Sequence, residues 1–183
     1  MIIASQKRKE NIAEYLLYMW QIEDLIRAYN LDMELIEQNI ISKYNIDKET
    51  RRQMVEWYES LIDMMRREDA VKSGHLQLNK NIIIQLTDLS NMLLKDPRYT
   101  EYSAEFYKAL PFIVELRAKA QENAVGEIET CFTALYGMLL MKLQGKTISP
   151  ETTVAIKQIS HFLAVLSHYY KLDAENELFK GED

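Results

Sequence analysis

The chain contains few of the residues that form turns, disulfide bonds and cysteine-rich metal sites. Its 183 residues include five glycines and three prolines, too few for the many turns of a β-sandwich or a β-barrel. Cys131 is the only cysteine, which excludes an intramolecular disulfide bond and a cysteine-rich zinc site. No apolar run reaches the roughly 18 residues that identify a membrane span. The composition therefore favours a helical protein that lies outside the membrane, in the cytoplasm.

Positive charge is also scarce. Lys and Arg total 22 and Asp and Glu total 28, so the formal net charge is -6. The basic residues form only short groups, and Arg52 and Arg67 each have an acidic residue four positions away, within reach on one helix face. Nucleic acids and anionic membranes are bound through clustered Lys and Arg. We therefore expect neither of them as a partner.

Apolar residues recur at helical spacing along most of the chain. This pattern predicts an all-α fold, a bundle of about seven helices that forms a single domain over residues 1–183, with frayed ends at 1–6 and 174–183. The predicted helices include residues 7–29 and 48–72, and a helix over 97–123 that Pro111 kinks or breaks. Breaks are expected near the following residues: Asn30, Asn45, Gly74, Asp96 and Thr147.

Two turns share the pattern Tyr-Asn-Leu/Ile-Asp-x-Glu, at residues 29–34 and 44–49. In each copy the Asn can adopt the left-handed conformation that ends a helix, and the Asp can cap the next helix. The two turns isolate a short helix over residues 33–43. We interpret the repeated pattern as two turns built in the same way, in preference to a repeated binding motif.

The segment 127–143 is the most apolar helix that the sequence predicts, with two apolar stripes and a side of small residues. The last helix starts at Ser149 and Pro150, an N-cap serine followed by a proline in the first turn. We expect these two helices to pair as a long antiparallel hairpin. The apolar surface of this hairpin exceeds what the other helices of one chain cover easily, which predicts a homodimer. His161 and His168 would lie near the dimer contact, and charging them at acidic pH could weaken that contact.

The sequence contains no motif that specifies a metal site or a reaction. No Glu-x-x-His or His-x-x-x-His pair occurs, and seven helical residues separate His161 from His168 by roughly 10 Å, too far for one metal ion. The residues 145–147 lack the glycine spacing of a phosphate-binding loop. We therefore assign no catalytic residue, no metal and no cofactor.

Five residues are weak candidates for ligand binding: Glu23, Arg27, His75, Tyr102 and Phe106. Glu23 lies at the edge of an apolar stripe, and a structural ion pair with Arg27 is favoured over an acid-base role. His75 follows a predicted helix end, where capping is favoured over ligand binding. Tyr102 and Phe106 belong to an aromatic run over 99–112 that is pocket-like but more typical of a core.

Three segments of the sequence resemble a known family. They are IAEYLLYMWQIEDLIRAY at residues 12–29, SGHLQ at 73–77 and the helix over 81–94. Together they resemble an uncharacterised all-helical bacterial family that is described only as a domain of unknown function. The resemblance covers nearly the whole chain and implies a bacterial cytoplasmic protein, but it brings no activity, cofactor or catalytic residue.

Two functions remain open at this point. The first is a non-enzymatic interaction or regulatory protein, a homodimer that could also bind another protein. The alternative is a small-ligand-binding helical bundle, or an enzyme with an unrecognised site, near the aromatic run. A closed core around Tyr102 and Phe106 would favour the first function, whereas a pocket on which Glu23, Arg27 or His75 converge would favour the second.

Overall fold

The computed structural model describes residues 2–120 and 125–179, and every regular element in these ranges is helical. The described part therefore confirms the predicted all-α class, with eight α-helices where about seven were expected. The α-helices are α1 (Ile2–Glu10), α2 (Ile12–Ala28), α3 (Met33–Asn39), α4 (Lys48–Arg67), α5 (Gln77–Lys95), α6 (Thr100–Ala120), α7 (Glu127–Leu143) and α8 (Pro150–Ala174). Two 3-10 turns, η1 (Ile41–Lys43) and η2 (Pro97–Tyr99), precede α4 and α6.

The predicted helix over residues 7–29 is two helices, because Asn11 separates α1 from α2. Asn11 has an extended backbone, with φ -153, and its side chain accepts hydrogen bonds from the amides of Ala13 and Glu14. This is the geometry of an N-cap, which starts a new helix even though the apolar spacing continues across it. Residues 2–6, which were expected to fray, lie in α1, and the C-terminal segment 174–183 falls partly outside the described residues.

Two other predicted boundaries differ from the structure. The helix α4 ends at Arg67, five residues before the predicted end, and Asp69 has a left-handed φ of 55 shortly after it. The helix α6 continues through Pro111 without a break, although the predicted end at residue 123 lies outside the described part of the chain. Buried Ala109 and Ile113 on either side of Pro111 hold this helix against its neighbours.

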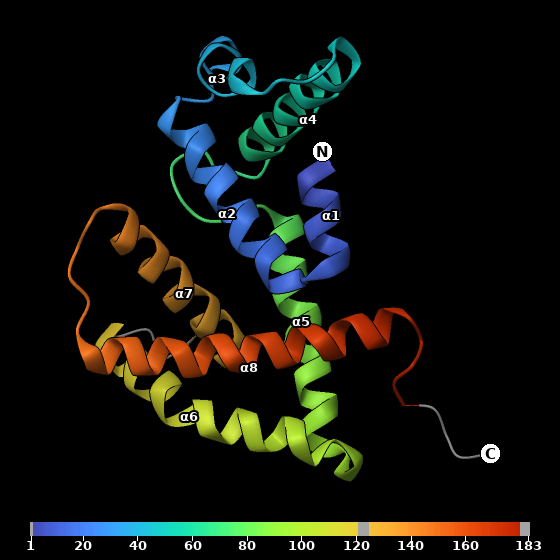
Figure 1. Ribbon diagram of the computed structural model, residues 1–183, viewed down its shortest axis with the longest axis vertical. Helices are drawn as coiled ribbons and strands as arrows, with labels where there is room; N and C mark the ends of the chain where they lie inside the picture. The colour runs from blue at the N-terminus through green and yellow to red at the C-terminus, as the bar shows by residue number, and fades with distance from the viewer. Residues whose placement is uncertain (1, 121–124, 180–183) are drawn as a thin grey trace.

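The molecule has two lobes that differ in size (Figure 1). The small lobe contains α3 and α4 at the top of the view, and the large lobe contains α5 to α8 below it. The helix α2 extends between the two lobes, and α1 packs against α2. The chain returns to the large lobe through residues 68–76, which we call the α4–α5 connection.

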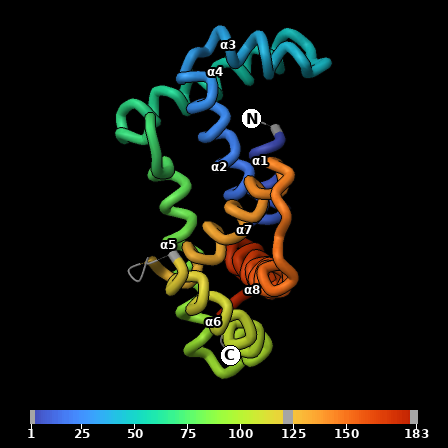
Figure 2. The backbone as a smooth tube through the Cα atoms, turned by 90° about the vertical axis from the view of Figure 1, so that its left-hand side faces the viewer, coloured from blue at the N-terminus to red at the C-terminus, as the bar shows by residue number. Residues whose placement is uncertain are grey.

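In the large lobe, α8 lies antiparallel beside α6, and α7 crosses α8 at an angle (Figures 1 and 2). The predicted long antiparallel hairpin of α7 and α8 is therefore not confirmed. The first half of α7 is buried, as Cys131 and Phe132 are fully covered. In its second half, Tyr136 and Met138 are still buried, and only the last turn is open, since Leu140 is half-buried and Leu143 is 71% exposed.

One hydrophobic core runs through both lobes. The largest side chains that it buries completely are aromatic, and they come from four different helices: Tyr58, Tyr102, Phe132 and Phe162. Burial of such side chains is the main stabilising contribution in a domain of this size. Among the described residues, no helix is both long enough and apolar enough to cross a membrane.

Candidate functional site

A buried carboxylate lies where α2, the α4–α5 connection and α5 meet. Glu23 is 0% exposed, and both of its oxygens are hydrogen-bonded. Its Oε1 accepts from the amide of Leu76 at 2.9 Å and from Nδ2 of Asn79 at 2.7 Å. Its Oε2 lies 2.6 Å from Nδ1 of His75. These three partners compensate the cost of removing the carboxylate from water.

Glu23 also provides a hydrogen-bond acceptor at the start of α5. The N-cap residue of α5 is Leu76, whose side chain cannot accept a hydrogen bond from the first amides of the helix. Carboxylates from other elements accept them instead. Glu23 binds the amide of Leu76, and Glu68 accepts from the amide of Gln77 at 2.6 Å. Both carboxylates also lie at the positive end of the helix dipole.

Arg27 lies one turn after Glu23 on α2 and binds the α4–α5 connection. Its guanidinium donates to the carbonyl oxygens of Ala70 and Gly74 and pairs with Asp24 at 2.8 Å. Glu23 pairs with His75 instead of the expected partner Arg27. Glu23 and Arg27, four residues apart on α2, thus both bind the α4–α5 connection. Glu23 binds the ring of His75 and the amide of Leu76, whereas Arg27 binds carbonyl groups. We call Glu23, Asp24, Arg27, His75 and Asn79 the buried polar cluster.

Aromatic rings enclose one side of the buried polar cluster. The ring of Trp20 stacks on His75 with centroids 4.0 Å apart, and Tyr136 of α7 meets Trp20 edge to face. The hydroxyl of Tyr136 donates to Oδ2 of Asp24 at 2.5 Å. Burial, followed by this hydrogen bond to Asp24, raises the pKa of Tyr136. The cluster therefore connects α2, α5 and α7.

The sequence predicts an ion pair of Glu23 with Arg27 and names His75 as a separate candidate; in the structure, Glu23 contacts His75, and Arg27 binds the connection that carries His75. Sequence reasoning missed Asn79 and Tyr136, which carry no signal in the sequence beyond their helical positions. Most of the hydrogen-bonding capacity of Glu23 and Arg27 is used by other groups of the chain. The side chain of His75 is 31% exposed, so it is the part of the cluster that solvent reaches.

Of the other two candidates, Tyr102 lies in the core of the large lobe, and the half-buried Phe106 packs against that core. Tyr102 is fully buried and its hydroxyl donates to Oγ of Ser90 on α5 at 2.6 Å. Burial raises its pKa. Phe106 packs edge to face on Phe162 of α8, with centroids 5.6 Å apart. Their neighbours are α5 and α8, and they do not contact the buried polar cluster.

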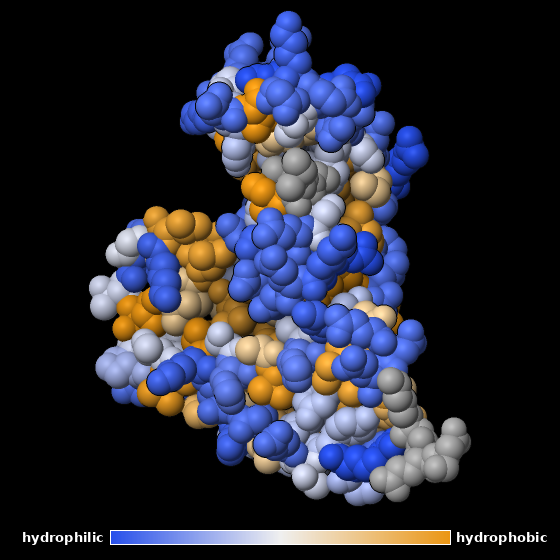
Figure 3. Space-filling view, turned by 45° about the vertical axis from the view of Figure 1, so that its right-hand side comes forward, coloured by the Kyte–Doolittle hydropathy of each residue, from blue (hydrophilic) through white to orange (hydrophobic). Residues whose placement is uncertain are grey.

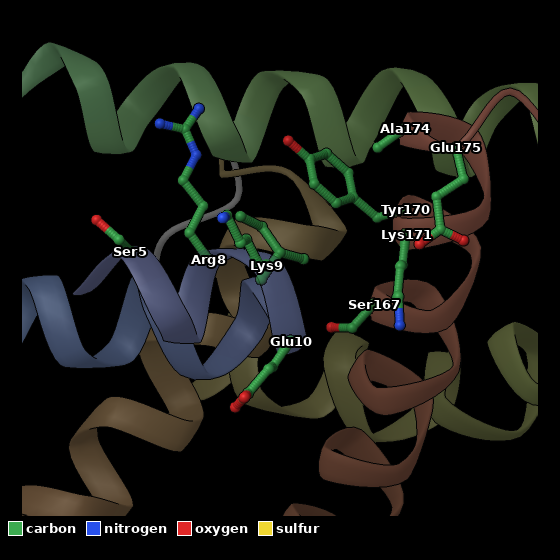
Figure 4. Close-up of a pocket in the computed structure, with 10 residues that line it drawn as sticks. Ser5, Arg8, Lys9, Glu10, Ser167, Tyr170, Lys171, Ala174 and Glu175 are labelled. Atoms are coloured by element: carbon green, nitrogen blue, oxygen red, sulfur yellow. The ribbon is translucent and has the colours of Figure 1, made fainter. Parts of the chain in front are cut away.

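Besides a hollow of about 640 Å³ between the α2–α3 turn and α4, two grooves along α8 are open to solvent. The larger, the α1–α8 groove, has a volume of about 810 Å³ and lies between the ends of α1 and α8 (Figure 4). The smaller, the α6–α8 groove, has a volume of about 490 Å³ and lies between the second half of α6 and the first turns of α8. Within the described ranges, no group of three or more His, Cys, Asp or Glu residues is placed to hold a metal ion.

Comparisons with known proteins identify a family but no function. No curated protein and no solved structure matches the chain. A family model matches residues 1–177, nearly the whole chain. Its description gives no activity, ligand or partner. The chain therefore belongs to the family described as a domain of unknown function, DUF4924.

Proposed function

We propose that this protein is a non-enzymatic interaction or regulatory protein of the cytoplasm that works as a homodimer. The observation that carries the proposal is the apolar surface along the α6–α8 groove. A free thiol at Cys131 is consistent with a reducing compartment. The partner that we propose for the surface is a second copy of the chain.

The α6–α8 groove is lined by apolar side chains from both helices. Phe112 and Leu116 come from α6, and Val154 and Ile156 come from α8. Val154 is 59% exposed, although it is a large apolar residue. Val114 of α6 is also exposed, but it lies two residues from Phe112 and Leu116 and therefore on another side of the helix. Figure 3 shows further hydrophobic side chains on the surface of the large lobe.

A twofold copy could cover this surface at little electrostatic cost. A standard interface buries about 800 Å² on each partner, which requires a cluster of apolar residues with a polar rim. The rim charges Glu115 and Lys119 pair with each other at 2.7 Å. The third rim charge, Glu151, lies exposed in the first turn of α8, so each copy brings one net negative charge to the edge of the contact, where solvent screens it. In a closed twofold arrangement, each Val154 would pack into or beside the groove of the other copy.

Sedimentation velocity at several micromolar concentrations tests the proposal. We expect a dimer for the natural chain, and Val154→Glu should weaken it at least about tenfold, because the contact would bury two unpaired carboxylates. Ile84→Glu is the matched control, since Ile84 is 53% exposed on α5 and lies outside the groove. A monomer for the natural chain, or equal dissociation by both variants, would contradict the proposal.

The alternative, a ligand or enzyme site near the aromatic run over 99–112, has less support. Tyr102 fills the core and uses its hydroxyl to bind Ser90, and Phe106 is half-buried against the same core. Glu23 contacts His75 of the α4–α5 connection, and Arg27 binds two carbonyl groups of the same connection. These contacts favour a role in holding α2 to α5.

A further inference from the structure

The outer face of α6 carries an exposed apolar stripe that is separate from the α6–α8 groove. Its members follow one another at alternating steps of three and four residues, which keeps them on one side of the helix: Ala104, Tyr107, Pro111, Val114 and Ala118. All five are exposed, and Tyr107 and Val114 are 62% and 54% exposed. We call these five residues the α6 stripe. Single exposed apolar residues are ordinary, but this spacing is that of a seam along which a second helix packs.

The α6 stripe lies opposite the face by which α6 packs on its own chain. That inner face includes Tyr102, Ala109 and Ile113, which are all 0% exposed. In Figure 1, α6 lies along the lower edge of the large lobe. Phe112, which lines the α6–α8 groove, follows Pro111 by one residue and so lies about 100° around the helix from it. The stripe is thus a surface of its own, which the described part of the chain leaves exposed.

The exposed charged residues of α6 all lie on one flank of the stripe. Their signs alternate along the helix, in the order Glu101, Lys108, Glu115 and Lys119. On the other flank, the half-buried Arg117 is bound within the chain, by Glu127 of α7 at 2.9 Å. The stripe is therefore bordered by charges of both signs on one side only.

The stripe is self-complementary about Pro111. When two copies of α6 lie antiparallel with their Pro111 residues opposite each other, residues about equally far before and after Pro111 face each other. Tyr107 then faces Val114 of the second copy, so the largest side chain of the stripe meets a smaller one. Ala104 faces Ala118, and two small side chains let the helices approach each other.

The same arrangement brings opposite charges together along the flank. Lys108 lies three residues before Pro111 and Glu115 lies four residues after it, so each Lys108 faces Glu115 of the second copy. In the same way, Glu101 faces Lys119. A parallel pair would instead place each of these residues beside its own copy, with like charges together. The charge order therefore favours an antiparallel second copy as the occupant of the stripe.

We propose that the α6 stripe binds the α6 stripe of a second copy of the chain, as an antiparallel helix pair with its twofold axis at Pro111. This contact goes beyond the homodimer proposed for the α6–α8 groove, because it uses another face of α6. A standard interface takes about 20–30 residues on each side, which is more than one narrow seam supplies. The stripe contact is therefore the weaker of the two, and it forms above the micromolar concentrations at which the groove contact is tested.

Cross-linking of introduced cysteines tests the position of the twofold axis. Pro111→Cys places the two thiols at the axis, so a short bismaleimide should join two copies at high protein concentration. Ala104→Cys alone and Ala118→Cys alone should not cross-link, because the two copies of each thiol lie about 20 Å apart along the helices. A mixture of these two variants should cross-link. Cys131 is fully buried and should not react in the folded chain.

A charge exchange tests the flank. Lys108→Glu should weaken association at high concentration in sedimentation equilibrium, since two carboxylates would then face each other. The double variant Lys108→Glu/Glu115→Lys restores opposite charges across the contact and should recover the association. Both residues also pair within the chain, with Glu105 and Lys119, each at 2.7 Å. Loss of these internal pairs alone would make the double variant weaker than the single one, so recovery distinguishes the contact between copies.

The variant Val154→Glu, which removes the groove contact, is the background in which the stripe is measured. In this background we expect concentration-dependent dimers, and adding Tyr107→Glu should weaken them at least about tenfold. Adding Ile84→Glu is the matched control, because Ile84 is 53% exposed on α5 and lies outside the stripe.

Three results would overturn the proposal. They are a Val154→Glu chain that stays monomeric at every concentration, equal effects of Tyr107→Glu and Ile84→Glu, and cross-linking of Ala104→Cys alone as fast as that of Pro111→Cys. The first of these leaves the groove contact supported if the natural chain is a dimer, so the two proposals can fail separately. Melting curves of all variants verify that each one is folded.

Discussion

Glu23 and His75 stand 52 residues apart in the chain, and their side chains meet at 2.6 Å. This contact closes the α4–α5 connection against α2 at the point where the small lobe joins the large one. The same carboxylate caps the start of α5, so one buried group fixes both the connection and the helix that follows it. The junction between the lobes therefore depends on a small number of polar contacts that can be removed one at a time.

Replacing Glu23 should destabilise the protein strongly. Glu23→Ala leaves the amide of Leu76 and the amide group of Asn79 without partners in a buried place, which costs about 3–5 kcal/mol. Glu23→Gln keeps the shape and one acceptor, and should cost about 1–2 kcal/mol. Urea unfolding measures both. Glu14→Gln is the control, because Glu14 is exposed and pairs only with Lys7, and a large loss there would show that the effect is not specific to the junction.

Arg27→Lys should loosen the α4–α5 connection without unfolding the core. A lysine keeps the charge but cannot reach the carbonyl oxygens of Ala70 and Gly74 with the fork of a guanidinium. We expect a loss of about 1–3 kcal/mol and faster hydrogen exchange of the amides in 68–76. Arg52→Lys is the control, since its pairs with Glu49 and Glu56 are exposed. Unchanged exchange in Arg27→Lys would mean that Glu23 alone holds the connection.

The sequence predicts the parts of this fold that are decided within a few residues. Asp32, Asp47 and Ser149 cap helices as their local patterns indicate. The two echoed turns are not identical, however, because Asn30 is left-handed with φ 55 and Asn45 has no positive φ. The cap at Asn11 had a local signal, an Asn three positions before Glu14, but the continuous apolar spacing concealed it.

The buried polar cluster could be predicted only in part. Glu23 and His75 were visible as polar residues next to apolar stripes, and a Glu in such a place requires a partner. Which partner it takes depends on how the chain folds back over dozens of residues, and helical spacing contains no such information. The nearest candidate by spacing was Arg27, which instead binds Asp24 and two carbonyl groups. The partner of Glu23 therefore depends on the tertiary fold and could not be read from helical spacing.

Alkaline pH should destabilise the protein. Burial raises the pKa of the Cys131 thiol above its ordinary value of 9.0, and burial raises the pKa of Tyr58 and Tyr102 above 10.0. These groups stay neutral in the folded chain but ionise in the unfolded chain. The stability is thus fully present below about pH 9 and is lost as the pH rises above it. Urea unfolding at several pH values measures the slope.

The variant Cys131→Ala separates the thiol from the tyrosines in that experiment. It removes a buried side chain and lowers the stability at every pH, but it should also remove the part of the pH slope that begins near pH 9. The thiol itself should react with a disulfide reagent only after unfolding, because Cys131 is fully buried. A free energy of unfolding that is constant up to about pH 11 would contradict the assigned burial of these groups.

Mild acid should not weaken the packing of α8 on α6. This contact lies within one chain, whereas the effect of acid expected from the sequence concerns the homodimer contact near His161 and His168. In the structure, Nε2 of His161 lies 3.3 Å from Oε2 of Glu105 on α6, so a charge gained by the imidazole faces a carboxylate. Lys108, with a smaller contribution from His161, lowers the pKa of Glu105. A carboxyl group with a lowered pKa contributes stability at pH values above its pKa in the unfolded chain, and this contribution is lost only as the pH falls through its pKa in the folded chain.

The variant Glu105→Gln measures this contribution. Glu105 and His161 are both partly exposed, so the substitution should cost less than about 1 kcal/mol at neutral pH. The difference between the natural chain and Glu105→Gln should then shrink only below the ordinary pKa of a carboxyl group, as Glu105 becomes protonated. Urea unfolding across this range, with His168→Gln as a control for histidine charge, decides the matter. A difference that is already lost between pH 7 and about pH 5, above the range in which carboxyl groups are protonated, would contradict the assignment of this contribution to Glu105.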